Sequence, residues 1–234
     1  MQSYLFLILS VVAGTLIAAF LFKQKSTSVK FLLTFSGAYL LGIGVFHLLP
    51  EIYEGHNHTI GFWIMGGFFI QLVLEVFSKG MEHGHGHKEM FHAKSLPIGV
   101  LASLFLHALL ESLPIGAQHD HGSKNALLWG IVIHKLPVSI ILFTMMKELT
   151  SNMGKILTVM VMFALIAPLG VFVGESLPIL GEYYRELTAL TLGVFLHIST
   201  TILFESNQSH RFNFMKFFAA GLAVVLAWFS VAHH

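Results

Sequence analysis

The most constraining feature of this sequence is a series of apolar stretches, each about as long as a lipid bilayer is thick. A helix needs about 20 mostly apolar residues to cross the hydrocarbon core. The 234-residue chain is expected to contain eight such spans, at residues 4–22, 31–50, 60–79, 95–116, 125–146, 156–175, 185–205 and 214–232. Only 11% of the residues are charged, against about 25% in soluble domains. The sequence therefore predicts an all-α, polytopic membrane protein with one domain over residues 1–234.

The first apolar stretch, YLFLILSVVAGTLIAAFLF, could also be a signal peptide. No basic residue precedes it, lysines follow it, and it is longer than a typical signal-peptide core. We therefore expect it to be the first transmembrane helix.

The basic residues outside the spans divide unequally between the two sides of the membrane. One side receives Lys23, Lys25, Lys30, Lys79, Lys88, Lys94, Lys147, Lys155, Arg211 and Lys216, and the other receives Lys124 and Arg185. Cytoplasmic loops carry the excess of lysine and arginine. This split predicts that both termini are extracytoplasmic. The net charge of +1 gives no reason to expect a nucleic-acid partner, and the chain has no cysteine for thiolate or disulfide chemistry.

Histidine is unusually frequent, with 15 residues against 12 acidic and 13 basic ones. In the predicted cytoplasmic linker 80–94, His83, His85 and His87 alternate with glycine. Glycine leaves such a segment adaptable, so we interpret it as a labile metal chelator. The alternative is an ordinary solvated polar loop.

The fourth span, LFLHALLESLPIG, carries two polar side chains inside an apolar helix. His107 and Glu111 lie four residues apart and therefore share one helix face. A charge at the bilayer centre costs about 2.5–3.5 kcal/mol on insertion scales, so these residues are expected to be functional. Pro114 has no N–H, which leaves the carbonyl of Leu110 without its helical hydrogen bond.

The fifth span, GIVIHKLPVSII, carries His134 at a depth similar to that of the fourth-span histidine, and Pro137 interrupts its hydrogen bonding. Broken helices near the membrane midplane are typical of transporter binding sites. We therefore predict a metal site formed by His107, Glu111 and His134. Lys135, in the same span, is expected to be an internal charge paired with Glu111, with snorkelling to the membrane surface as the alternative.

Other spans carry polar residues nearer their ends. In the second span, His47 and Glu51 are expected near the outer surface, where they either guide cations inward or simply end the helix. In the seventh span we interpret His197 as a hydrogen-bonded packing residue, with metal ligation as the alternative. Glu75 and Glu205 lie at predicted cytoplasmic ends, where they either line an exit path or are interfacial.

Taken together, these motifs resemble the ZIP (zinc/iron-regulated-transporter-like) family of divalent-metal transporters. The resemblance rests on eight spans, extracytoplasmic termini, a histidine-rich loop between spans three and four, HLLPE in span two, H-x-x-x-E in span four and H-K-x-P in span five. It implies metal uptake through a site between spans four and five, where two adjacent metal sites are often described.

The resemblance also marks departures from the family pattern. Ala108 and Val138 stand where the family tends to place ligands, and Lys135 takes another position of the second site. This implies a single-site member, in which the lysine ammonium replaces the second metal. His47, Ser139, backbone carbonyls or water would complete the first site.

The predicted function is uptake of divalent transition-metal cations into the cytoplasm. Imidazole and carboxylate ligands suit Zn²⁺, and also Fe²⁺, Mn²⁺ or Cd²⁺. The alternatives are a metal-efflux protein and a metal-sensing protein. We expect no enzyme activity, because the H-E-x-x-H pattern of zinc peptidases is absent. The short loops suggest a bacterial inner membrane, and a homodimer is left open.

Overall fold

The computed structural model describes residues 1–21, 26–54, 59–78, 80, 98–117, 122–205 and 214–232, and these residues form helices. The elements are α1 (Gln2–Leu21), α2 (Ser26–Ile43), the π-helical turn η1 (Gly44–Leu48), α3 (Leu49–Tyr53), α4 (Ile60–Ser78), α5 (Ile98–Ala117), α6 (Gly122–Leu149), α7 (Met153–Ser176), α8 (Pro178–Glu182), α9 (Tyr184–Glu205) and α10 (Phe214–Ala232). The prediction of a helical protein is confirmed for this part of the chain.

Seven of the eight predicted spans correspond to helices that are long and apolar enough to cross a membrane. The second of these runs through α2, η1 and α3, and the others are α1, α4, α5, α6, α7 and α9. The eighth predicted span corresponds to α10, whose apolar stretch, Phe214–Ser230, is shorter than those of the other seven. The helices support a multi-pass membrane protein with at least seven candidate spans.

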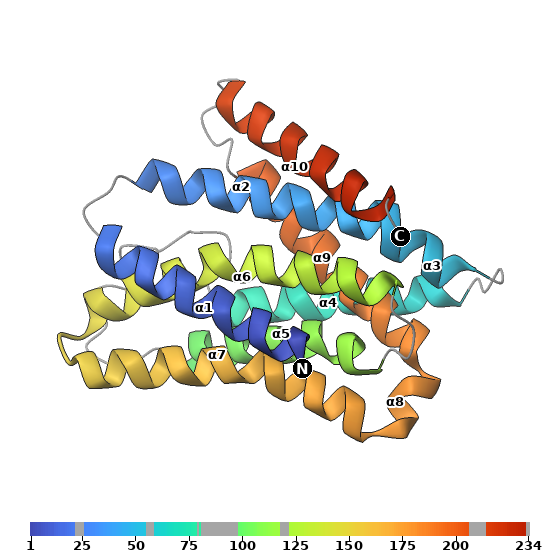
Figure 1. Ribbon diagram of the computed structural model, residues 1–234, viewed down its shortest axis with the longest axis horizontal. Coiled ribbons are helices and arrows are strands. Elements are labelled where there is room, and N and C mark those ends of the chain that lie inside the picture. Colours follow the sequence, from blue (N-terminus) through green and yellow to red (C-terminus); the bar gives the residue numbers. More distant parts are fainter. Residues whose placement is uncertain are drawn as a thin grey trace.

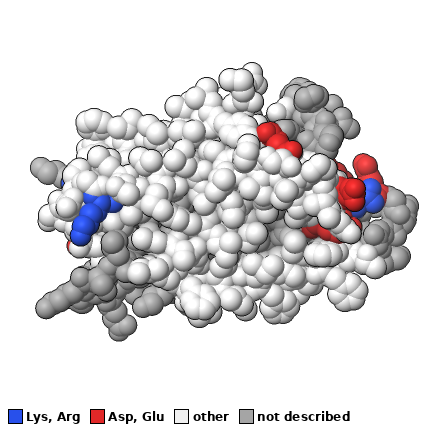
Figure 2. Space-filling view, turned by 90° about the horizontal axis from the view of Figure 1, so that it is seen from below, with Lys and Arg blue, Asp and Glu red and all other residues white. Residues whose placement is uncertain are grey.

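The helices lie roughly along one common direction, and charged side chains gather near the ends of the bundle. In Figure 1 the first turn of α1 and the last turn of α10 point toward the end that carries α3 and α8. Figure 2 shows charged side chains near the two ends of one face, with a wide uncharged band between them. Such a band matches the hydrocarbon layer of a bilayer, where charges are costly.

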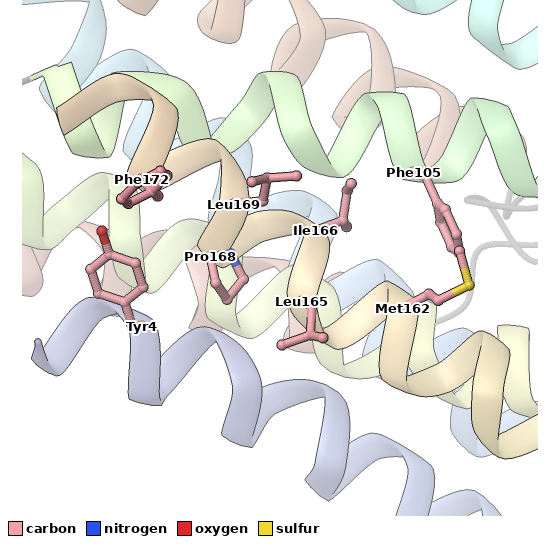
Figure 3. Close-up of a pocket in the computed structure, with 8 residues that line it drawn as sticks. All are labelled: Tyr4, Phe105, Met162, Leu165, Ile166, Pro168, Leu169 and Phe172. Carbon is pink, nitrogen blue, oxygen red and sulfur yellow. The ribbon is translucent and has the colours of Figure 1, made fainter. Parts of the chain in front are cut away.

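Helix α7 has one face exposed at the surface and the opposite face buried against other helices. Val161, Leu165 and Leu169 follow one another at four-residue spacing and are about half exposed, whereas Phe163 and Ala167 on the other side are buried. An exposed stripe of large apolar side chains is expected where a helix faces lipid. Figure 3 shows part of this outer surface, an apolar groove of about 510 Å³ between α1, α5 and α7, with Tyr4 at one end and Phe105 at the other.

Small residues allow the closest helix pairs to approach. A Cβ added at Gly67 of α4 would overlap the carbonyl oxygen of Leu190 in α9, and one added at Gly193 of α9 would overlap that of Ile64 in α4. Backbone approach of this kind is the usual way in which transmembrane helices associate without a hydrophobic driving force. The two glycines, one on each helix, therefore allow the backbones of α4 and α9 to pack in direct contact.

The second span changes its helical geometry close to its polar residues. The backbone N–H of Leu49 bonds to the carbonyl of Gly44, five residues earlier, and Pro50 follows immediately. Single π turns occur frequently at functional sites. The π turn carries His47, so the irregular backbone of this span lies directly at one of its predicted polar residues.

Candidate functional site

The candidate site lies where α5 and α6 meet, deep within the bundle. His107 and Glu111 on α5, and His134 and Lys135 on α6, each expose 3% or less of their surface. Pro114 and Pro137 lie inside their helices, one turn or less from these polar residues. Four titratable side chains thus gather in a region that is otherwise apolar.

Glu111 is the centre of this group, because each of its oxygens has a different partner. Lys135 Nζ donates a hydrogen bond to Glu111 Oε1 at 3.0 Å. Glu111 Oε2 lies 3.2 Å from Nε2 of His107, one helical turn away. The predicted pairing of Lys135 with Glu111 is confirmed. A buried carboxylate needs such a counter-charge, because an uncompensated charge in this position is strongly destabilising.

The second histidine completes the cluster from α6. The rings of His107 and His134 lie with their centroids 6.2 Å apart and nearly perpendicular. In the described residues, no three histidine or acidic side chains converge on one point that could hold a metal ion in the arrangement seen. The ammonium of Lys135 already occupies one oxygen of Glu111. A cation would have to exchange with that ammonium or with the His107 contact.

The two positions that depart from the ZIP pattern carry buried apolar side chains. Ala108 and Val138 are both buried, and both belong to one apolar cluster with Leu104, Phe143 and Phe163. Ser139 directs its hydroxyl to the carbonyl of Leu136 in its own helix, and lies against Gly14 of α1. The polar groups in contact with Glu111 are therefore an imidazole and the lysine ammonium. Ala108 and Val138 add no atom that could bind a metal ion.

A second polar pair, between α4 and α9, was not predicted as a pair. His197 Nε2 contacts Glu75 Oε2, and the edge of its ring packs against Phe68, with centroids 4.8 Å apart. Ser103, one turn before His107 on α5, donates a hydrogen bond to the carbonyl of Leu74. Glu75 follows Leu74 in α4, so the hydrogen bond from Ser103 links the helix of the main cluster to a helix that carries this second pair. Residues 122 apart in sequence gave no signal of this contact.

The polar residues at the end of the second span are also held by a contact that the sequence did not indicate. The hydroxyl of Tyr184, at the start of α9, donates a hydrogen bond to Glu51 Oε1 at 2.8 Å. His47 lies on the π turn and is partly buried. Three predicted residues, His83, His85 and His87, lie outside the described part of the chain, as does the side chain of Glu205.

Comparison with known proteins shows to which family the chain belongs. The model of the family described as "ZIP Zinc transporter" matches residues 79–229, which is more than half of the chain and includes α5, α6, α7 and α9. The chain belongs to the ZIP zinc transporter family. The resemblance inferred from the sequence is thereby confirmed, and membership makes this protein one of a family of transporters.

Individual relatives match a smaller part of the chain. Two of them, both named zinc transporter SLC39A7, come from Rattus norvegicus and Mus musculus. Each is 30% identical over 77 aligned residues, which cover 25% of this chain and 16% of the relative. The matched part of this chain thus spans about a sixth of the length of these relatives.

Proposed function

We propose that this protein carries divalent transition-metal cations, zinc foremost, across a membrane into the cytoplasm, with the transported cation bound between α5 and α6. The observation that carries the proposal is the buried group of His107, Glu111 and His134 at the junction of two proline-containing membrane helices. Membership in the ZIP family and the printed names of the relatives support zinc as the cargo. Imidazole and carboxylate donors are also compatible with Fe²⁺, Mn²⁺ and Cd²⁺.

Three protein donors suit a cation that must leave again. Zinc sites that exchange ligands usually have three protein ligands and keep a fourth position for water or substrate. His107, Glu111 and His134 would supply the three, and water would supply the fourth. Because these groups bind metal only when deprotonated, uptake is expected to weaken as the pH falls.

The remaining polar residues suggest a path on either side of this site. On the outer side, His47 and Glu51 would receive the cation before it reaches Glu111. On the inner side, the paired side chains of Glu75 and His197 would line the exit, and the histidine-rich segment 80–94 would take the cation after release. The unequal division of lysine and arginine between the two ends supports eight spans and extracytoplasmic termini. Inward transport is what the resemblance to the ZIP family implies.

One cation at a time is the expected occupancy. Ala108 and Val138 contribute no donor atoms, and Lys135 places a positive charge 3.0 Å from the only carboxylate of the buried group. A second divalent ion beside that ammonium would meet repulsion with no added ligand to offset it. The lysine would thus keep the carboxylate neutralised between transport events.

The direct test is uptake of radioactive zinc into proteoliposomes that contain the full chain. We expect His107→Ala and Glu111→Gln to reduce flux at least tenfold. Ser112→Ala is the matched control, because Ser112 is equally buried next to Glu111 but donates only to carbonyls of its own helix. Equal flux in all four proteins would reject the site. A native protein that binds zinc but shows no flux in either direction would favour a metal sensor instead.

A further inference from the structure

The ammonium of Lys135 has a second partner besides Glu111, and this partner is an aromatic ring. Lys135 Nζ lies 4.7 Å from the ring centroid of Phe163 in α7. A cation over a ring face within about 6 Å of the centroid is attracted by the electron-rich face, and more strongly when both are removed from water. Both side chains expose 2% of their surface or less, so the contact is fully desolvated.

These contacts place one ammonium between two partners from two different helices. The carboxylate of Glu111 belongs to α5, and the ring of Phe163 belongs to α7. While the carboxylate is 3.0 Å away, its full negative charge dominates the interaction, and the ring adds little. If another cation binds to that carboxylate, the ammonium loses its interaction with Glu111. Of its two partners, only the ring of Phe163 then still attracts it.

The ring is also held in place for this role. Phe163 stacks on Phe105 of α5, with centroids 6.0 Å apart and planes inclined by 27°. It also belongs to the apolar cluster that includes Val138 and Phe143. A ring packed on these sides cannot move away from the ammonium at low cost, because buried side chains are close-packed.

From this geometry we infer that Phe163 is a positioning residue for transport: its ring receives the Lys135 ammonium when a divalent cation displaces that ammonium from Glu111. The inference rests on the proposed function, since it concerns exchange at the same carboxylate. Without the ring, the displaced ammonium would lose the aromatic partner that lies 4.7 Å from it. Metal binding would then be weaker, although no metal ligand had been changed.

The test is a double-mutant cycle on zinc affinity, measured by calorimetry on the full chain in lipid nanodiscs. A desolvated cation–π contact of about 0.5–2 kcal/mol corresponds to roughly 2- to 30-fold in affinity. We expect Phe163→Leu to raise the Kd for zinc within this range, and to leave the Kd unchanged when Lys135→Met is already present. Phe143→Leu is the matched control, because it removes another buried ring from the same apolar cluster.

A second variant guards against loss of packing at this position. Replacing Phe163 with a trifluorinated phenylalanine by codon suppression withdraws electron density from the ring face while nearly preserving its shape, and it should weaken zinc binding in the same direction. Unchanged or tighter binding in both variants would overturn the inference, as would an equal loss in the Lys135→Met background. If His107→Ala and Glu111→Gln also leave the Kd unchanged, the proposed site itself fails. If those two abolish binding while the Phe163 variants do not, only the role of Phe163 fails.

Discussion

Removal of the Lys135 ammonium should destabilise the protein and make its stability depend on zinc. At an effective dielectric constant of about 20, two unit charges 3.0 Å apart attract each other by about 5–6 kcal/mol. Part of this attraction offsets desolvation, and breaking one side of a buried pair usually costs about 3–5 kcal/mol. Lys135→Met keeps an unbranched side chain one atom shorter and removes the ammonium with its hydrogen bond, so Glu111 would remain buried without that counter-charge.

Thermal unfolding in detergent measures this cost directly. For a chain of this size, about 3–5 kcal/mol corresponds to a fall in Tm of roughly 6–20 °C. In the proposed mechanism zinc replaces the ammonium as the counter-charge of Glu111, so saturating zinc should raise the Tm of Lys135→Met more than that of the native protein. The double variant Glu111→Gln/Lys135→Met contains no buried charge at this point, so it should recover much of the lost stability and lose the response to zinc.

Two results would refute this reasoning. If Lys135→Met unfolds at the native temperature, the ammonium does not neutralise Glu111 in the folded protein. If the double variant is less stable than Lys135→Met alone, the two side chains do not form a mutually dependent pair. Either outcome would also remove the argument that the lysine limits the site to one cation.

Other contacts allow further tests. Gly193→Leu should force α4 and α9 apart and lower the free energy of unfolding by about 1–3 kcal/mol or more, measured by thermal unfolding. Gly221→Leu in α10 is the control, because a Cβ there meets nothing within 4 Å, and an equal loss would contradict the packing argument. Tyr184→Phe removes the hydrogen bond to Glu51, so the KM for zinc uptake should fall several-fold at an unchanged maximal rate; an unchanged KM would exclude Glu51 from the outer path. His197→Phe should cost about 1–3 kcal/mol of stability, and less when its carboxylate partner in α4 is already neutralised. Additive losses would show that the pair is not coupled.

The sequence could predict the apolar helices and the buried polar group of the candidate site because both follow from local rules. A bilayer requires apolar stretches of a set length, and these remain visible whatever the helices pack against. His107 and Glu111 share a face because the helix repeat is fixed. Lys135 could be paired with Glu111 because a buried lysine in an apolar span has few charged partners to choose from.

The remaining contacts depend on which helices become neighbours, and the sequence carries little information about that. Phe163 is one of 22 phenylalanines, and nothing in its local sequence distinguishes it from those that face lipid. Tyr184 and Glu51 are separated by 133 residues. The position of a polar residue within an apolar stretch predicts its depth in the membrane. Its partner on another helix can be identified only from the packed structure.

The π turn at Gly44–Leu48 has a consequence for every residue that follows it in the second span. A turn closed over five residues contains one residue more than the α-helical spacing, so the continuing helix is rotated by about 100° relative to an uninterrupted one. Glu51 faces Tyr184 in this rotated frame. Deleting a single residue from the turn would restore the α-helical frame, keep the apolar span nearly the same length, and swing the carboxylate by more than a quarter of a turn. The insertion or deletion of one residue in this turn is therefore enough to decide which neighbouring helix Glu51 faces.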